Sequence, residues 1–218
     1  MSDSILIRLA VEDALSEAIL RRVLAERPVQ YVIGAVYGKG GAGYLKKQTR
    51  AFNSAAHVYP FVLLTDLDDH ECPPGLVTEW LAGRPRNGMF LFRVAVREVE
   101  SWLLADLASL RSFLHARGSR DIQTPEDLLD PKEELLRIAA SGRVTQKREA
   151  LVRRDDRSGQ LRQGPDYNGT LAQFVAESWS VVTARSLCPS LDGLWSALQR
   201  LESDVILSGS GAFRPLRE

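Results

Sequence analysis

Three carboxylates stand directly after two strand-like segments. Glu12 follows the apolar, β-branched segment 5–11, and Asp66 and Asp68 follow the apolar segment 61–65. Neighbouring parallel strands end at one edge of a sheet, which is where ligands bind in open α/β sheets. In an extended chain, side chains two residues apart point to the same side, so both aspartates should face Glu12. Two like charges about 4 Å apart repel by about 4 kcal/mol at an effective dielectric constant of about 20, so this cluster requires a proton or a cation.

Oxygen ligands without histidine or cysteine suit Mg²⁺ or Mn²⁺. The sequence therefore predicts a divalent-metal site made by Glu12, Asp66 and Asp68. The alternative is that the two aspartates only stabilise a turn or cap a helix, as aspartates after strands commonly do. Asp13 has two interpretations as well, because it is placed either to cap the following helix or to assist Glu12.

Two further acids, Glu98 and Glu100, begin the helical segment 98–115 directly after the fourth strand-like segment, residues 89–96. At about 100° per residue, their side chains would diverge by about 200° around a helix. We therefore expect at most one of them to reach the metal site. The alternative is that both acids simply complement the positive end of the helix dipole.

Lys39 lies in the glycine-rich turn 38–43, after the strand-like segment 31–37 and on the same predicted sheet edge. Backbone N–H groups and an ammonium group in such a turn suit a phosphate. The turn lacks the Walker A spacing, and a plain flexible loop is the alternative.

A locally basic segment, residues 143–154, carries five basic residues against the single acid Glu149. Phosphate binding needs such a local excess of positive charge, and a solvated helix face is the alternative. The basic residues are Arg143, Lys147, Arg148, Arg153 and Arg154.

The elements that must position these residues alternate between strand and helix in the first half of the chain. This pattern predicts an α/β fold with a mostly parallel sheet flanked by helices over residues 1–117. The strand-like segment 61–65 is almost wholly apolar, which is typical of a central strand buried on both faces. Residues 118–218 read as a mainly helical subdomain packed on this sheet, with no clear strand after residue 125.

The composition excludes several classes of protein. Formal net charge is zero, so no global field draws the chain to nucleic acid or to an anionic membrane, and any such attraction must be local. Cys72 and Cys188 show neither a zinc-binding nor a redox spacing, which favours reduced thiols. The chain has no signal peptide and no apolar run of about 18 residues, so we expect a cytoplasmic protein without membrane contact.

Taken in order along the chain, these motifs resemble the TOPRIM module of topoisomerases, bacterial primases and overcoming-lysogenization-defect nucleases. The pattern is most similar to a bacterial TOPRIM-like family of uncharacterised function, whose members tend to be encoded beside ABC-type (AAA-like) ATPases in phage-defence loci. Asp13 departs from the TOPRIM pattern, in which glycine usually follows the glutamate. The segments that carry the resemblance are Val11-Glu12, residues 38–41, Leu64-Thr65-Asp66-Leu67-Asp68, residues 97–106 and residues 164–168.

The resemblance implies a TOPRIM-like, Rossmann-like sheet and a Mg²⁺- or Mn²⁺-dependent nuclease. Such a nuclease would be the effector of an anti-phage defence system, with an ATPase as partner and DNA or RNA as substrate. Glu12, Asp66 and Asp68 would bind the metal, Glu100 is the favoured fourth acid, and Lys39 and the basic segment would hold the nucleic acid.

A non-catalytic TOPRIM-like module that binds an ABC-type ATPase and is regulated by it is the alternative. Asp13 and Ala14, which follow the glutamate in place of the usual glycine, favour this second interpretation. Self-association of the chain stays open in both.

Overall fold

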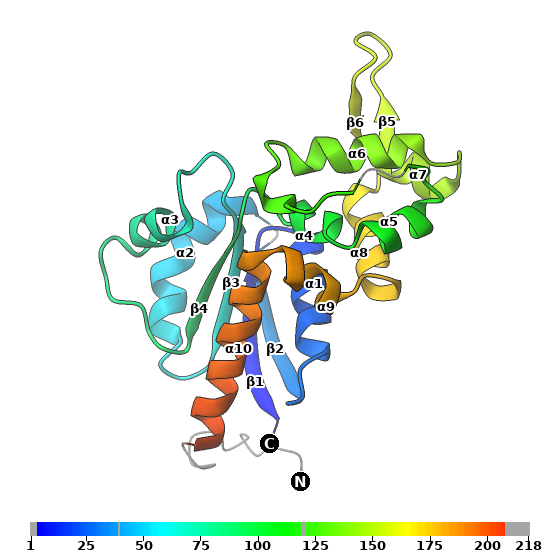
Figure 1. Cartoon of the computed structure of the whole chain (residues 1–218). Helices are drawn as coiled ribbons and strands as arrows, with labels where there is room; N and C mark the ends of the chain where they lie inside the picture. Colours follow the sequence, from blue (N-terminus) through cyan, green and yellow to red (C-terminus); the bar gives the residue numbers. More distant parts are fainter. Residues whose placement is uncertain (1–3, 39, 119–120, 208–218) are drawn as a thin grey trace.

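The computed structural model describes residues 4–38, 40–118 and 121–207 (Figure 1). Within these ranges, the main sheet has four parallel strands in the order β2–β1–β3–β4. The predicted α/β fold is therefore confirmed. The strands are β1 (Ile5–Val11), β2 (Tyr31–Gly38), β3 (Phe61–Asp66) and β4 (Phe90–Ala95).

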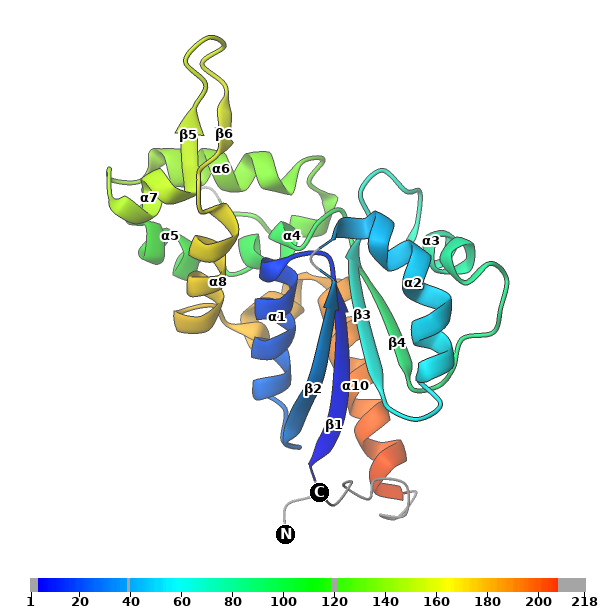
Figure 2. The same cartoon turned by 180° about the vertical axis from the view of Figure 1, so that it is seen from behind.

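Helices cover both faces of this sheet, and alternate strand residues face the two layers (Figure 2). Leu9 and Leu64 pack on the side of α1 (Ala14–Ala25), whereas Phe61 and Leu63 pack on the side of α2 (Gly41–Ala55) and α3 (Pro73–Leu81). Because β3 is buried from both sides, its sequence is apolar without alternation. This is the central position predicted for it.

The second half of the chain is mostly helical, and part of it packs onto the sheet. The helix α8 lies against α1, and α10 lies across β4. No helix in the described part of the chain is long and apolar enough to cross a membrane. The elements after β4 are α4 (Glu100–Leu104), α5 (Leu107–Leu114), η1 (Pro125–Asp127), α6 (Pro131–Ser141), α7 (Gln146–Leu151), β5 (Val152–Arg154), β6 (Leu161–Gln163), α8 (Tyr167–Glu177), α9 (Val181–Leu187) and α10 (Pro189–Leu207).

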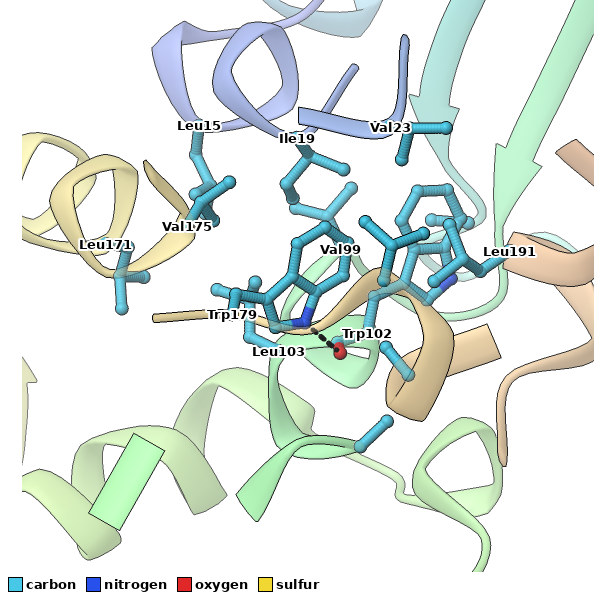
Figure 3. Close-up of a cluster of buried hydrophobic side chains, with 14 of the residues drawn as sticks. Leu15, Ile19, Val23, Val99, Trp102, Leu103, Leu171, Val175, Trp179 and Leu191 are labelled. Carbon is cyan, nitrogen blue, oxygen red and sulfur yellow. Dashed lines mark hydrogen bonds between the residues drawn. The ribbon is translucent and has the colours of Figure 1, made fainter. Parts of the chain in front are cut away.

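Two tryptophans join the sheet layer to the second half (Figure 3). Trp102 of α4 and Trp179, which follows α8, are both fully buried, and the indole N–H of Trp179 donates to the carbonyl oxygen of Trp102 at 3.0 Å. Figure 3 shows apolar residues of α1 and α8 around this pair. One hydrophobic core is therefore shared by residues from both halves of the chain.

Two predictions about the later elements are wrong. The expected single helix over residues 98–115 is broken, because Asp106 lies between α4 and α5 and its side chain accepts from Ser109 N–H at 3.4 Å and from Ser180 N–H at 2.8 Å. Strands were not expected after residue 125, yet β5 and β6 form an antiparallel hairpin. Each strand has three residues and carries arginine, so neither shows an alternating apolar pattern.

A buried ion pair connects α10 to the segment between α1 and β2. The guanidinium of Arg27 lies 2.6 Å from the Glu202 carboxylate, with side chains only 3% and 6% exposed. Tyr31 donates its hydroxyl hydrogen to Glu202 at 3.0 Å, and Arg27 also lies over the ring of Trp195. The pair is thus enclosed by groups that satisfy its charges and hydrogen bonds.

Breaking this pair from one side should destabilise the fold strongly. We expect Glu202→Ala to lower the free energy of unfolding by about 3–5 kcal/mol, because Arg27 would stay buried without its partner. Glu26→Ala is the control, since its pair with Arg22 is partly exposed, and we expect a loss below about 1 kcal/mol. Urea unfolding measures the free energy of unfolding of both variants. Equal losses in Glu202→Ala and Glu26→Ala would contradict burial as the reason why the Arg27–Glu202 pair matters more.

Candidate active site

The carboxyl ends of three strands meet at one edge of the parallel sheet. Val11 of β1 pairs with Leu64 of β3, and Asp66 of β3 pairs with Ala95 of β4. The strand ends that carry the predicted metal ligands are therefore adjacent, as predicted. We call the five carboxylates that lie at or just after these strand ends the acidic edge; they are Glu12, Asp66, Asp68, Glu98 and Glu100.

Glu12 connects the end of β1 to the end of β3. Its Oε1 accepts hydrogen bonds from the hydroxyl of Thr65 and from the backbone N–H of Asp66, the latter at 2.9 Å. Burial raises the pKa of Glu12, the two hydrogen bonds oppose that rise, and the negative charges of Asp68 and Asp13 add to it. The site thus holds Glu12 in place while making its ionisation unfavourable.

Asp66 lies at the centre of the acidic edge. Its Oδ1 accepts from the backbone N–H of Val99 at 3.0 Å, and Val99 is the N-cap residue of α4. Burial raises the pKa of Asp66 well above its ordinary value, and the charges of Glu100 and then Glu12 raise it further. Asp66 therefore contacts the residue that precedes α4 and also lies among the other acids.

Asp68 reaches the acidic edge by a different geometry from the one expected. Its φ is +48°, in the left-handed region, and its N–H donates to the carbonyl oxygen of Arg97 at 3.0 Å. The chain after Asp66 is therefore not extended, and the expectation that residues two apart share a side is wrong here. Asp68 is exposed, yet its charge raises the pKa of both Glu12 and Asp66.

Glu98 and Glu100 reach one common cation, although they were expected to diverge. The helix α4 begins only at Glu100, so Glu98 lies in the turn before it and the spacing around a helix does not apply. The ammonium group of Lys132 lies 2.8 Å from Glu98 Oε1 and 3.8 Å from Glu100 Oε1. Burial opposes protonation of Lys132, but the charges of Glu100 and Glu98 raise its pKa overall. Lys132 therefore acts as an internal counter-ion.

Glu98 and Glu100 could each accept a further hydrogen bond, a proton or a positively charged partner. Glu98 Oε2 is buried and has no hydrogen-bond partner among the described residues. Burial raises the pKa of Glu100 to about 7, although Lys132 and a 2.9 Å hydrogen bond from the hydroxyl of Tyr167 oppose that rise. Both carboxylates are thus placed to interact with a further positive group or a proton.

Tyr167 and Asn168 also contact residues of the site, which no local sequence pattern predicted. The helix α8 begins at Tyr167, and Asn168 lies inside it. The amide of Asn168 donates to Asp13 Oδ2 at 3.2 Å, while Asp13 Oδ1 caps α1 by accepting from Ser16 N–H at 2.8 Å. The segment 164–168 is nevertheless one of the motifs that carry the resemblance to TOPRIM proteins.

Lys132 and Thr65 were also missed as parts of the site. Lys132 lies 34 positions from Glu98 in the sequence, within the basic and acidic pattern of an ordinary amphipathic helix. No local spacing connects it with the strand ends. Thr65 directly precedes the motif Asp66-Leu67-Asp68, and no sequence pattern indicated that its hydroxyl would contact Glu12.

Lys39, predicted to bind phosphate, lies outside the described residues. Gly41, two positions after it, lies next to the end of β1, because its N–H donates to the carbonyl oxygen of Glu12 at 3.3 Å. Gly38 has a φ of +130°, and a Cβ there would lie 1.8 Å from the carbonyl oxygen of Val11. Only glycine allows the end of β2 to approach β1 so closely.

The structure places the predicted basic residues in three different surroundings. Arg148, Arg153 and Arg154 line one cavity of about 300 Å³ beside the β5–β6 hairpin. Lys147 instead lies over the ring of Phe113 and 3.8 Å from a carboxylate oxygen of Glu177. The side chain of Arg143 is exposed in the turn before α7.

The carboxylate oxygens of the acidic edge are ligands of the kind that a hard divalent cation binds. The side chains, however, are not arranged around one ion position. Over the described ranges, no group of three or more His, Cys, Asp or Glu side chains lies where it could hold a metal ion. Burial, with a smaller contribution from neighbouring charges, raises the pKa of Glu12 and Asp66, and Glu98 Oε2 is buried without a hydrogen-bond partner among the described residues. Oxygen-only donors of this kind suit Mg²⁺ or Mn²⁺, and Glu12, Asp66 and Asp68 are the residues that could hold such an ion.

A comparison with protein families gives one match, to the family model described as "Domain of unknown function (DUF4276)", over residues 11–199. This range includes every carboxylate of the acidic edge, Lys132 and the β5–β6 hairpin. No curated protein and no solved structure matches the chain.

The raised pKa of Glu100 predicts a pH-dependent stability. Its pKa is about 7 in the fold against about 4.5 in the unfolded chain. Its stabilising contribution is therefore complete below the unfolded value and is lost as pH rises through about 7. Glu100→Gln, neutral throughout, should weaken this fall in the free energy of unfolding by at most about 1.4 kcal/mol per pH unit.

Urea unfolding at several pH values in a metal chelator measures this effect. Glu133→Gln is the matched control, because the Glu133 side chain is 59% exposed. The difference between wild type and Glu100→Gln isolates Glu100 from the other buried acids. Parallel pH profiles for wild type and both variants would contradict burial as the cause.

Proposed function

Because the chain belongs to the DUF4276 family, whose function is unknown, we propose from the acidic edge itself that the protein is a Mg²⁺- or Mn²⁺-dependent, TOPRIM-type nuclease. The observation that carries the proposal is the placement of five carboxylates at the ends of three adjacent parallel strands. A structural role alone does not require Glu12, Asp66 and Glu100 to be buried near one another, since burying charged groups is costly. A polyanionic substrate would be accepted there only with a cation present.

In this proposal, Glu12, Asp66 and Asp68 hold the divalent cation. The bound ion would activate water and stabilise the negative charge that develops on the phosphate. Lys132 brings a fixed positive charge to the same edge, which favours an approaching phosphodiester. Glu100, with a pKa of about 7, is suited to exchange a proton near neutral pH.

The proposed setting is a cytoplasmic anti-phage defence system in which an ABC-type or AAA-like ATPase controls the nuclease. The sequence resemblance to TOPRIM-like proteins supports this part of the proposal. Lys39 and the basic residues of segment 143–154 would contact DNA or RNA phosphates.

A non-catalytic module that binds the ATPase is the second candidate, and the hydrogen bonds at the site favour it. Glu12 Oε1 is engaged by Thr65 and by the Asp66 N–H, while Asp66 Oδ1 is engaged by the Val99 N–H. Such contacts would give these acids a purely structural role. The two candidates differ in whether the acids bind metal and support cleavage.

Metal binding should be visible as a change in stability. A divalent cation that binds only the folded state stabilises it by about 2.7 kcal/mol at a hundredfold excess over its Kd. We therefore expect Mg²⁺ or Mn²⁺ to raise the Tm of the wild type and to raise that of Asp66→Asn much less. Asparagine keeps an Oδ1 that accepts from Val99 N–H, so the variant should fold.

Asp69→Asn is the control for this measurement, because Asp69 is an exposed neighbour outside the acidic edge and the change in charge is the same. Its Tm should respond to the cation as the wild type does. If all three proteins responded equally, the cation would bind elsewhere.

Cleavage should depend on Asp68. We expect Asp68→Asn to reduce nucleic-acid cleavage by at least about a hundredfold, because loss of a group that positions a catalytic charge has effects of this size. Asparagine is preferable to alanine because position 68 has a φ of +48°, in the left-handed region, which asparagine adopts at lower cost than alanine. The assay requires the reconstituted ATPase complex with its trigger and labelled DNA and RNA.

Asp69→Asn again provides the matched control and should cleave as the wild type does. Equal cleavage by wild type and Asp68→Asn in a responsive complex would overturn the assignment of Asp68. A complex that responds to its trigger without any cleavage would favour the interaction module.

A further inference from the structure

The hairpin of β5 and β6 stands out from the body of the molecule next to α6 (Figure 1). A groove of about 670 Å³ lies along one side of this hairpin, and Lys132 and Leu136 of α6 together with Arg153, Leu161 and Arg162 are among the residues that line it. We call this cavity the hairpin groove. No carboxylate of the acidic edge lines it, but one of its lining residues, Lys132, pairs with Glu98 of that edge.

Two arginines face each other across the hairpin. Arg153 of β5 is the direct partner of Arg162 of β6, and both are exposed. Like charges opposite each other destabilise a strand pair. Arg162 donates to Gln160 Oε1 at 3.1 Å, and its charge helps to lower the pKa of Asp155. Among the described residues, however, no carboxylate oxygen lies within 4.0 Å of either guanidinium in an ion pair. The pair is therefore a concentrated positive charge that an anion would stabilise.

The acids that line the hairpin groove are already engaged in the helix α6. Asp130 caps α6 by accepting from Glu133 N–H at 2.6 Å, and the carboxylate of Glu133 lies 2.8 Å from the guanidinium of Arg137. These acids therefore do not neutralise Arg153 and Arg162 directly.

Positive charge continues in a second cavity beside the hairpin. This cavity of about 300 Å³ shares Arg153 and Leu161 with the hairpin groove, and Arg148 and Arg154 also line it. Arg148 Nε is buried and has no hydrogen-bond partner in the part of the chain described. Glu149 is the one acid of this lining against three arginines. Arg153 thus lies between two cavities that both favour an anion.

Lys132 links this surface to the acidic edge. Its side chain lines the hairpin groove, while its ammonium group lies 2.8 Å from Glu98 and 3.8 Å from Glu100. A linear polyanion that lies in the groove would therefore run from the Arg153–Arg162 pair to the carboxylates proposed to act on it.

We infer that the hairpin groove binds the sugar–phosphate backbone of a single nucleic-acid strand and leads it to the acidic edge, an inference that rests on the proposed nuclease function. Paired guanidinium groups suit phosphate, which they contact through two parallel hydrogen bonds. The volume is that of a small-ligand pocket, which fits a short stretch of one strand. No aromatic residue lines the groove as described, so bases have no stacking platform there, and binding is independent of sequence.

The test is binding of a fluorescent single-stranded oligonucleotide, without ATPase and in a metal chelator, so that no cleavage is needed. We expect Arg153→Ala combined with Arg162→Ala to weaken binding by at least about tenfold. The slope of log affinity against log salt should become shallower by about 1.4, since each single-strand phosphate contact contributes about 0.7. Two unrelated oligonucleotide sequences should bind equally.

Arg157→Ala is the matched control, because Arg157 is an exposed arginine of the same hairpin that lines neither cavity. It changes the net charge by one unit and should leave the salt slope unchanged. Thermal unfolding of all variants provides a second measurement: removing the Arg153–Arg162 repulsion should leave the Tm equal to or above that of the wild type.

Several results would overturn the inference. These are wild-type affinity in the double variant, an equal loss in Arg157→Ala, or tighter binding of poly-glutamate than of the oligonucleotide at matched charge. The nuclease proposal is tested separately by the Asp68→Asn cleavage assay. A protein that cleaves through Asp68 but binds without Arg153 and Arg162 would retain the proposed function and lose this groove.

Discussion

The burial of carboxylates at the ends of the parallel strands is the constraint that the contacts around the acidic edge must meet. The parallel sheet brings Glu12, Asp66 and the acids after β4 to one edge, and burial raises the pKa values of Glu12, Asp66 and Glu100. Donors from distant segments partly compensate these carboxylates: the backbone N–H of Val99, the hydroxyl of Tyr167 and the ammonium of Lys132. Each of these contacts also fastens a segment to the sheet. These polar contacts therefore add to the hydrophobic core around Trp102 and Trp179 that joins the second half to the sheet.

Hydrogen bonds and Lys132 compensate only part of the carboxylate charge at the acidic edge. This incomplete compensation favours a functional interpretation of the acids over a purely structural one. A set of acids needed only for stability would be expected to have every buried oxygen paired. Glu98 Oε2 has no hydrogen-bond partner among the described residues, and Asp66 carries a strongly raised pKa at the centre of the cluster. The hairpin beside it shows the opposite imbalance, with Arg153 facing Arg162 and no ion pair to either within the described chain. An edge with excess negative charge next to a groove with excess positive charge suits a bound cation together with a polyanion.

The local features that the sequence predicted best are those with a strong periodic pattern. The apolar segment 61–65 was recognised as a central strand because it is buried on both faces, and β3 is that strand. The break at Asp106 was missed because apolar residues continue at helical spacing on both sides of it. The β5–β6 hairpin was missed because strands of three residues that carry arginine show no alternation. Short elements are held by tertiary contacts, which leave little trace in the local sequence.

The sequence by itself determined the fold class and the chemistry available at the sheet edge. Parallel strands must end on one side, so Glu12 and Asp66 had to lie near each other once β1 and β3 were neighbours. Tertiary structure alone decided which other groups join them. The left-handed turn at Asp68 and the start of α4 at Glu100 changed the expected side-chain directions. Lys132 and Tyr167 reach the site from segments 34 and 67 positions away from Glu98 and Glu100. No local spacing encodes such contacts, because they depend on how the helices after β4 pack against the sheet.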